Sequence, residues 1–252
     1  MKAFIKAYWK TLLFFTVVGW IGGWVSGLYL LESYPPEMQQ EMLAQGMTDT
    51  KIALTMAIQS ATYGLVLGAL GIWLGKKVGL WKDERHITKK PLLAALVISL
   101  IGGLGIILPD LLFFSKYEPA LLDTYAVKPT IPYLLATVTY GAVIEEVMLR
   151  LFMMSLVAFV LHLLFERKRK EVSTAVLVVA NVVSALLFAA GHLPVNEMMY
   201  GLTPMIVFRC FLLNGVFALA FGWLYRKYGL RYAMIAHGGC HVVSKLIWIL
   251  FL

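Results

Sequence analysis

IPYLLATVTYGAVIEEVMLRLFMMSLVAFVLHLLF, residues 131–165, is the stretch of the sequence that decides the fold. A helix crosses the hydrocarbon core of a bilayer with about 20 apolar residues, because every backbone amide must find its partner inside the segment. This stretch exceeds that length, yet it contains Glu145, Glu146, Arg150 and His162. We therefore predict a membrane-spanning helix that carries polar chemistry. Its excess length fits a helix that tilts, projects from the bilayer or breaks near the two glutamates.

The rest of the chain has the same apolar character. Hydrophobic residues make up 60% of the 252 residues and charged residues only 14%, whereas a soluble domain carries about a quarter charged residues. Six more stretches are long enough to span a bilayer, at approximately 8–31, 52–75, 91–113, 172–192, 202–225 and 231–252. The predicted fold class is all-α: a polytopic transmembrane helical bundle of about seven spans, with eight as the alternative.

The basic residues predict the orientation of these spans. Sixteen of the 22 Lys and Arg residues lie at 1–10, 76–90, 166–171 and 226–231, and the alternate connections hold only Lys51, Lys116 and Lys128. Basic residues accumulate on the cytoplasmic side of membrane proteins, so this alternation predicts a cytoplasmic N-terminus. The net charge of +8 then reflects topology and anionic lipid, and it gives no reason to invoke nucleic acid as a partner.

The two halves of the chain differ in composition. Residues 1–130 carry glycines at four-residue spacing, as at Gly19, Gly23 and Gly27, which forms a smooth stripe where another helix can approach closely. Residues 131–252 hold both intramembrane glutamates, all three intramembrane basic residues and most of the histidines. Ionisable groups inside a membrane are expensive and usually functional. We predict one membrane domain, with scaffold helices at 1–130 and a catalytic core at 131–252.

The fourth span carries the acidic pair. Glu146 and Arg150 are four positions apart and share one helix face, so they can form an ion pair that offsets the cost of burial. Glu145 points about 100° away from that pair and is left available as a general base. A buried salt-bridge network accounts for Glu146 and Arg150 equally well, but it gives no reason for Glu145.

Histidines mark the fifth and seventh spans. His237 and His241 project from one face of a helix, so both imidazoles can reach one metal ion or one oxyanion, and Gly238 and Gly239 are expected to leave space for a substrate. His192 ends the fifth span just before Pro194, where a helix-terminal hydrogen-bonding role is the alternative. These boundaries place His192 near the outer end of its span and His237 about 10 Å from the inner end of its own. If His192 and His237 share one site, the boundary predicted for at least one of these two spans must be wrong.

Together these residues form a recognisable pattern. Glu145-Glu146-x-x-x-Arg150 on one helix, Phe188-x-x-x-His192 on the next and His237-x-x-x-His241 on a later one resemble the CAAX protease and bacteriocin-processing family. That family comprises glutamate-dependent intramembrane proteases and includes the type II CAAX prenyl endopeptidases. The resemblance covers roughly residues 131–245 and says nothing about residues 1–130.

The resemblance implies a role for each residue. Glu145 and His192 would activate a water molecule, His237 and His241 would stabilise an oxyanion or help to hold a metal ion, and Glu146 and Arg150 would support the site. The family commonly has Asn or Asp at the position of His241. An imidazole can donate to an oxyanion as Asn does, but it is also a better ligand for zinc. His192, His237, His241 and Glu145 would make a tetrahedral set of ligands for Zn²⁺, so zinc is a candidate cofactor.

The predicted function is hydrolysis of a peptide bond in a membrane-embedded or lipidated protein or peptide, such as a prenylated CAAX or bacteriocin-like substrate. The expected partners are that substrate and the lipid bilayer, and the expected location is the plasma membrane of a bacterium or archaeon. One alternative is a non-catalytic membrane scaffold or immunity protein with the same fold. A transporter or proton relay ranks last, because inverted repeats and paired broken helices are not apparent in the sequence.

Overall fold

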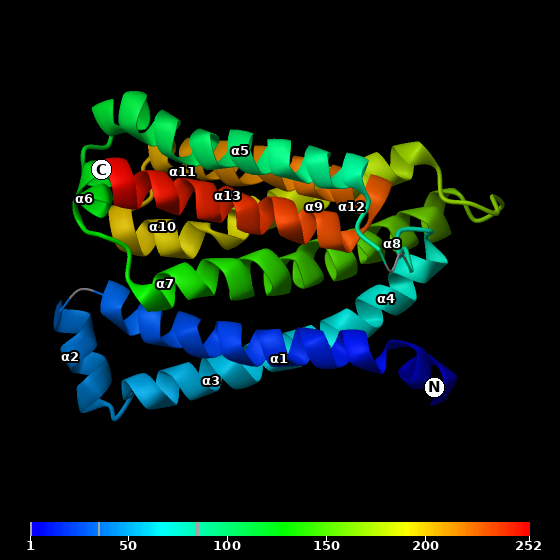
Figure 1. The fold of residues 1–252 in the computed structure, drawn as a ribbon, viewed down its shortest axis with the longest axis horizontal. Helices are drawn as coiled ribbons and strands as arrows, with labels where there is room; N and C mark the ends of the chain where they lie inside the picture. The colour runs from blue at the N-terminus through cyan, green and yellow to red at the C-terminus, as the bar shows by residue number, and fades with distance from the viewer. Residues whose placement is uncertain (1, 35, 84–85) are drawn as a thin grey trace.

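The helices of the chain run side by side along the long axis of a bundle, as a computed structural model of residues 2–34, 36–83 and 86–252 shows (Figure 1). Seven of the helices in this described part are long and apolar enough to cross a membrane, and it contains no strand. The all-α, seven-span prediction is confirmed. The N- and C-termini lie at opposite ends of the bundle, as an odd number of spans requires (Figure 1).

Each span is built from one or more helical segments. The first half contains α1 (Lys2–Ser33), α2 (Pro36–Ala44), α3 (Asp49–Thr62), the π-helical η1 (Tyr63–Leu67), α4 (Gly68–Lys77), α5 (Lys89–Leu112), the short 3₁₀ turn η2 (Phe114–Lys116) and α6 (Ala120–Ala126). The second half contains α7 (Ile131–Ala136), π-helical η3 (Thr137–Glu145) and η4 (Val147–Met154), α8 (Ser155–Phe165), α9 (Thr174–Gly191), α10 (Leu193–Tyr200), α11 (Pro204–Cys210), π-helical η5 (Phe211–Gly215), α12 (Val216–Tyr228) and α13 (Leu230–Phe251).

The glycine stripe of α1 packs against α3. A methyl group added at Gly19, Gly23 or Gly27 would lie 2.2–2.5 Å from backbone atoms of Ser60, Met56 or Ala53, respectively. Only glycine allows the two backbones to approach this closely, which is the small-residue packing expected in membranes. The predicted stripe therefore serves packing within the chain, and α1 with α3 and α4 forms one side of the bundle (Figure 1).

The fourth span is central to the fold. It runs as one 35-residue stretch from Ile131 to Phe165, and its η3 segment packs against both α1 and α13. It does not break at the glutamates, so the eight-span alternative is not needed for the described residues. The helix is instead π-helical on both sides of Glu146, with hydrogen bonds that join residues five apart and turns that hold more residues. Short π-helical stretches are frequent at functional sites.

The fifth span resolves the mismatch in depth between His192 and His237. The predicted end at residue 192 is wrong: the span extends from Thr174 to Tyr200. The chain changes from α9 to α10 at His192, and Pro194 is accommodated in the first turn of α10, where no backbone donor is needed. His192 therefore lies inside the span, at a junction between two helices.

Candidate active site

Glu146 and Arg150 form the buried ion pair predicted from their spacing. Arg150 Nη1 lies 3.0 Å from Glu146 Oε1, and the two side chains are 1% and 0% exposed. The guanidinium also lies over the rings of Phe188 and Phe221, with its central carbon 4.5 and 5.5 Å from the ring centroids. A buried charge needs such compensation, because loss of hydration costs several kcal/mol per ion. The pair and the two rings fix the centre of the site between η4, α9 and α12.

The same carboxylate binds a histidine, which sequence reasoning missed. His237 Nδ1 lies 2.9 Å from Glu146 Oε1, and an ionised carboxylate only accepts, so the nitrogen donates. This bond fixes the tautomer and the direction of the ring, and Phe221 stacks on its face with the ring planes 16° apart. Glu146 was predicted only to support the site through Arg150. Its second partner became visible only when α13 was placed beside the fourth span.

Glu145 occupies the accessible side of His237. Its Oε2 lies 3.9 Å from His237 Nε2, which is the ring nitrogen that faces away from Glu146. Its side chain is 20% exposed, whereas the side chain of Glu146 is fully buried. Residues on wider π-helical turns are separated by a smaller angle, which lets adjacent glutamates approach the same imidazole. Glu145 is free of the Glu146–Arg150 pair, as its angular offset indicated.

His241 extends this line of imidazoles by one turn of α13. Its Nε2 lies 3.2 Å from His237 Nε2, so one of these nitrogens carries the proton between them. The other ring nitrogen of His241, Nδ1, is buried and has no hydrogen-bond partner among the described residues. A buried polar atom without a partner is costly, so this nitrogen is available to a water molecule or a bound ligand.

His192 approaches the site from the α9–α10 junction. Its Nδ1 lies 2.8 Å from the carbonyl oxygen of Phe188; because that oxygen only accepts, Nδ1 donates and Nε2 stays free to accept. The ring of Phe188 contacts both His192 and His237, with centroids 4.7 and 5.7 Å away. The two histidines thus share one phenylalanine as a neighbour. Within the described residues, no direct hydrogen bond joins His192 to Glu145.

Two glycines do not have the role that the sequence suggested. A methyl group at Gly239 would lie 2.0 Å from Ser99 Oγ, and one at Gly238 would lie 3.1 Å from Ala142 Cβ. These positions are filled by the packing of α13 against α5 and η3, so the expected substrate space beside them is absent. Space is found instead at Gly191, beside His192, where an added methyl group would meet nothing within 4 Å.

A second polar cluster, formed by α5, α6, α10 and α11, was not predicted from the sequence. The guanidinium of Arg209 makes two hydrogen bonds to the carboxylate of Asp110, which is 1% exposed, and a third to Asn196 Oδ1 at 3.2 Å. Tyr125 donates to Asp110 at 2.8 Å. Asn196 in turn donates to the backbone oxygen of His192 at 2.7 Å, which links this cluster to the site. The sequence signal was Asp110 itself, an acidic residue near the end of an otherwise apolar span.

The side chains predicted to bind zinc fit that ion only in part. The 3.2 Å between His237 Nε2 and His241 Nε2 is close to the separation of two nitrogens on one tetrahedral zinc ion with bonds of about 2.0–2.1 Å. No three His, Cys, Asp or Glu side chains of the described residues are grouped to hold a metal ion, however. The four-residue set of Glu145, His192, His237 and His241 is not assembled in this arrangement. Zinc binding therefore stays a prediction.

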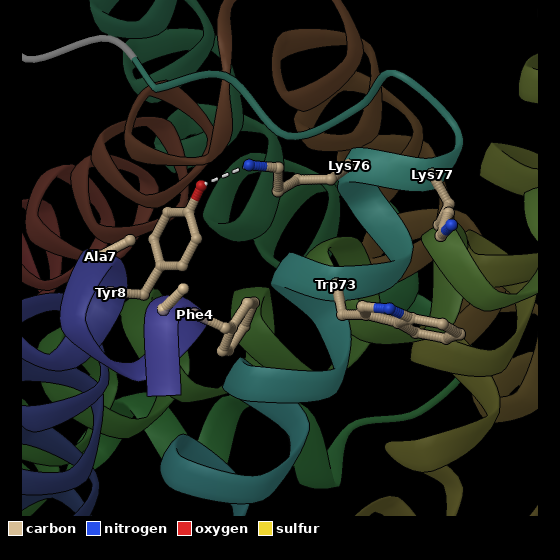
Figure 2. Close-up of a pocket in the computed structure, with 7 residues that line it drawn as sticks. Phe4, Ala7, Tyr8, Trp73, Lys76 and Lys77 are labelled. Carbon is tan, nitrogen blue, oxygen red and sulfur yellow. Dashed lines mark hydrogen bonds between the residues drawn. The ribbon is translucent and has the colours of Figure 1, made fainter. Parts of the chain in front are cut away.

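The site is separate from the cavity shown in Figure 2. That cavity, of about 500 Å³, lies between α1 and α4 and is lined by Phe4, Tyr8, Trp73 and Lys76, among others. Lys76 donates to the Tyr8 hydroxyl at 2.7 Å across it (Figure 2). None of the predicted site residues lines this cavity.

Fold and site together define a class of protein: an integral, multi-pass α-helical membrane protein with a carboxylate–imidazole site inside its bundle. The model of a protein family, described as type II CAAX prenyl endopeptidase Rce1-like, matches residues 127–243. This range contains all six predicted site residues, and the match confirms the resemblance to the CAAX protease family in this part of the chain. At family level it supports a CAAX-type intramembrane protease. No curated protein and no solved structure matched the chain.

Proposed function

We propose that the chain is an intramembrane endopeptidase in which Glu145 is the general base. The observation that supports this most directly is the difference between the two glutamates. Glu146 is fully buried, hydrogen-bonded to His237 and ion-paired with Arg150, whereas Glu145 is partly accessible and lies 3.9 Å from Nε2 of the same ring. A general base must reach the proton that it removes, and only Glu145 remains open to a water molecule.

In the proposed reaction Glu145 takes a proton from a water molecule as the water oxygen bonds to the carbonyl carbon of a peptide. The electron pair of the C=O bond moves to oxygen, and the N–H that joins His237 Nε2 to His241 Nε2 turns from the neighbouring ring to donate to this oxyanion. When the intermediate collapses, the C–N bond breaks and Glu145 returns its proton to the departing nitrogen. The products are a carboxylic acid and an amine. His192 Nε2 is free to accept from the same water molecule.

The substrate in this proposal is a protein or peptide held at the membrane. A site inside a bundle of spanning helices meets chains that are themselves embedded or lipidated. Prenylated CAAX sequences are the first class to test, because the matching family is described by them. Bacteriocin-like peptides are the second class. A cytoplasmic N-terminus, a catalytic core at 131–252 and a bacterial or archaeal plasma membrane belong to the same proposal.

The deciding experiment is cleavage of internally quenched peptides by the purified full-length chain in detergent. A farnesylated CAAX peptide and its unmodified twin are compared for the wild type, Glu145→Gln and Glu171→Gln. We expect kcat/KM of Glu145→Gln to fall about 10²–10⁴-fold, the range for loss of a general base. Glu171 is exposed in the connection before α9, so Glu171→Gln should stay within about twofold of the wild type.

Full activity of Glu145→Gln would overturn the assignment of Glu145 as the base. Two results together would instead favour the non-catalytic scaffold. The wild type would cleave neither the farnesylated peptide nor its unmodified twin, and Glu145→Gln would rescue a deletion strain. Thermal unfolding of both variants controls for loss of the fold.

A further inference from the structure

Lys245 is a buried cation for which the described residues provide no counter-ion. Lys245 lies on α13, one turn beyond His241, and is 8% exposed. Its Nζ lies over the rings of Tyr133 and Trp248, 4.8 and 5.9 Å from their centroids. Among the described residues no carboxylate lies within 4.0 Å of it. The other intramembrane cations differ in this respect, since Arg150 is paired with Glu146 and Arg209 with Asp110.

Contacts with the rings offset only part of the cost of burying this ammonium group. The attraction of a cation to an aromatic face is smaller than the cost of removing the same cation from water. Lys245 is 8% exposed as a whole residue, so most of its stem is packed inside the bundle. An anion placed against Nζ would complete its environment.

A second polar group beside Lys245 also lacks a partner. Nδ1 of His241, one turn closer to the proposed base, is buried without a hydrogen bond in the part of the chain that the structure describes. Two incomplete polar groups thus follow each other along α13, starting from the His237–His241 pair. This is the arrangement expected where a ligand, and not another side chain, supplies the missing partners.

We propose that Lys245 binds a carboxylate of the substrate, three or four residues from the peptide bond that is cleaved. This inference rests on the proposed function and names a specificity-determining residue for it. One helical turn of about 6 Å separates Lys245 from His241 along α13. The lysine stem adds a similar length, and an extended peptide advances about 3.3–3.6 Å per residue. Three or four residues therefore cover the distance.

The carboxylate has two sources in a peptide, a free C-terminus or the side chain of Asp or Glu. The chemistry at Nζ is the same for both. Three versions of one quenched peptide separate them: a free acid at the C-terminus, a C-terminal amide, and an amide with Asp as its last residue. A preference for the first alone identifies the C-terminus, and equal preference for the first and third shows that any carboxylate at that distance is accepted.

The test compares the wild type with Lys245→Met and Lys245→Arg in the full-length chain. Methionine keeps a long apolar stem without the charge, and arginine keeps the charge, so folded Lys245→Arg controls for simple disruption of packing. We expect the wild type to favour a carboxylate-bearing peptide over the plain amide by about tenfold or more in kcat/KM. Lys245→Met should lose that preference, and Lys245→Arg should retain a preference.

Binding separates failure of this inference from failure of the proposed function. The affinity of Glu145→Gln for the same three peptides is measured with and without Lys245→Met, and it requires no turnover. An acid-to-amide ratio that Lys245→Met leaves unchanged would overturn the carboxylate site even if the wild type cleaves peptides. Loss of the ratio in Lys245→Met supports the site, and absence of cleavage by the wild type would then count against the protease assignment alone.

Discussion

Two clusters of buried charge lie in the second half of this bundle, and they differ in how completely their polar atoms are bonded. Around Arg209, the guanidinium has hydrogen bonds to Asp110 and Asn196, and the carboxylate of Asp110 accepts further from Tyr125. Around Arg150, by contrast, Glu146 Oε2, both Nη atoms of Arg150 and Nδ1 of His241 make no hydrogen bond within the described residues. The first cluster is complete without a ligand, and the second is not.

This difference separates a structural charge pair from a functional one. Complete bonding maximises the stability that a buried pair can contribute, whereas incomplete bonding leaves groups that can respond to a substrate. The α5–α11 cluster therefore holds helices together and, through Asn196, supports the backbone at His192. The cluster on the fourth span and α13 gives up some stability and keeps polar atoms available for chemistry.

Breaking the complete cluster should have the largest effect on stability. Arg209→Met leaves the carboxylate of Asp110, 1% exposed, without its counter-ion, and we expect the free energy of unfolding to fall by about 3–5 kcal/mol. Activity per folded molecule should stay within about threefold, because Arg209 contacts none of the groups proposed for chemistry. Reversible unfolding in mixed micelles measures the first quantity and peptide cleavage the second.

Arg169→Met is the matched control for this substitution. Arg169 is paired with Glu166 at 3.5 Å, but its side chain is 64% exposed, and an exposed pair contributes about 0–1 kcal/mol. If Arg209→Met is no more destabilising than Arg169→Met, the α5–α11 cluster is not the structural element that its bonding indicates.

His241 provides a sharper test of the incomplete cluster. If it acts as a hydrogen-bond donor, His241→Asn should keep kcat/KM within about fivefold, because an amide can donate as an imidazole does. His241→Ala removes the donor and should lower kcat/KM by about 10–100-fold. Zinc content of the wild type and both variants is measured on the same samples. Loss of activity in His241→Asn together with loss of one bound zinc ion per chain would make His241 a metal ligand and not a donor.

Features that depend on local sequence were predicted well. The seven spans follow from hydropathy, and the Glu146–Arg150 pair follows from a spacing of four residues on one helix. Both are properties of a segment taken by itself. The glycine stripe of α1 also carries its own signal, because small residues at regular spacing have little use except close packing.

Features that depend on how helices are rotated against each other were missed. Glu146 and His237 are 91 residues apart, and Asp110 and Arg209 are 99 apart, so no local pattern links them. The filled positions at Gly238 and Gly239 have the same origin, since only the docking of α5 and η3 decides whether a glycine faces space. The extension of the fifth span past His192 was hidden by Pro194, which is compatible both with a helix end and with a helix start.

The smallest effect is expected at the contact that joins α9 to the π-helical part of the fourth span. Ser184, 1% exposed, donates from Oγ to the backbone oxygen of Leu149 at 2.7 Å, one residue before Arg150. Ser184→Ala should lower the free energy of unfolding by about 1 kcal/mol, the usual net value of one hydrogen bond. Ser115→Ala is the matched control, because Ser115 bonds only to the carbonyl of Leu111 within its own helical run, and its loss should cost less than about 0.5 kcal/mol.

If the Ser184 contact also holds the π-helical turns in place, kcat/KM will fall up to about twofold in Ser184→Ala and stay unchanged in Ser115→Ala. Equal unfolding free energies for the two variants would show that the fourth span keeps its π-helical form without support from α9, so that the geometry around Glu145 and Glu146 is set by the fourth span and α13 alone.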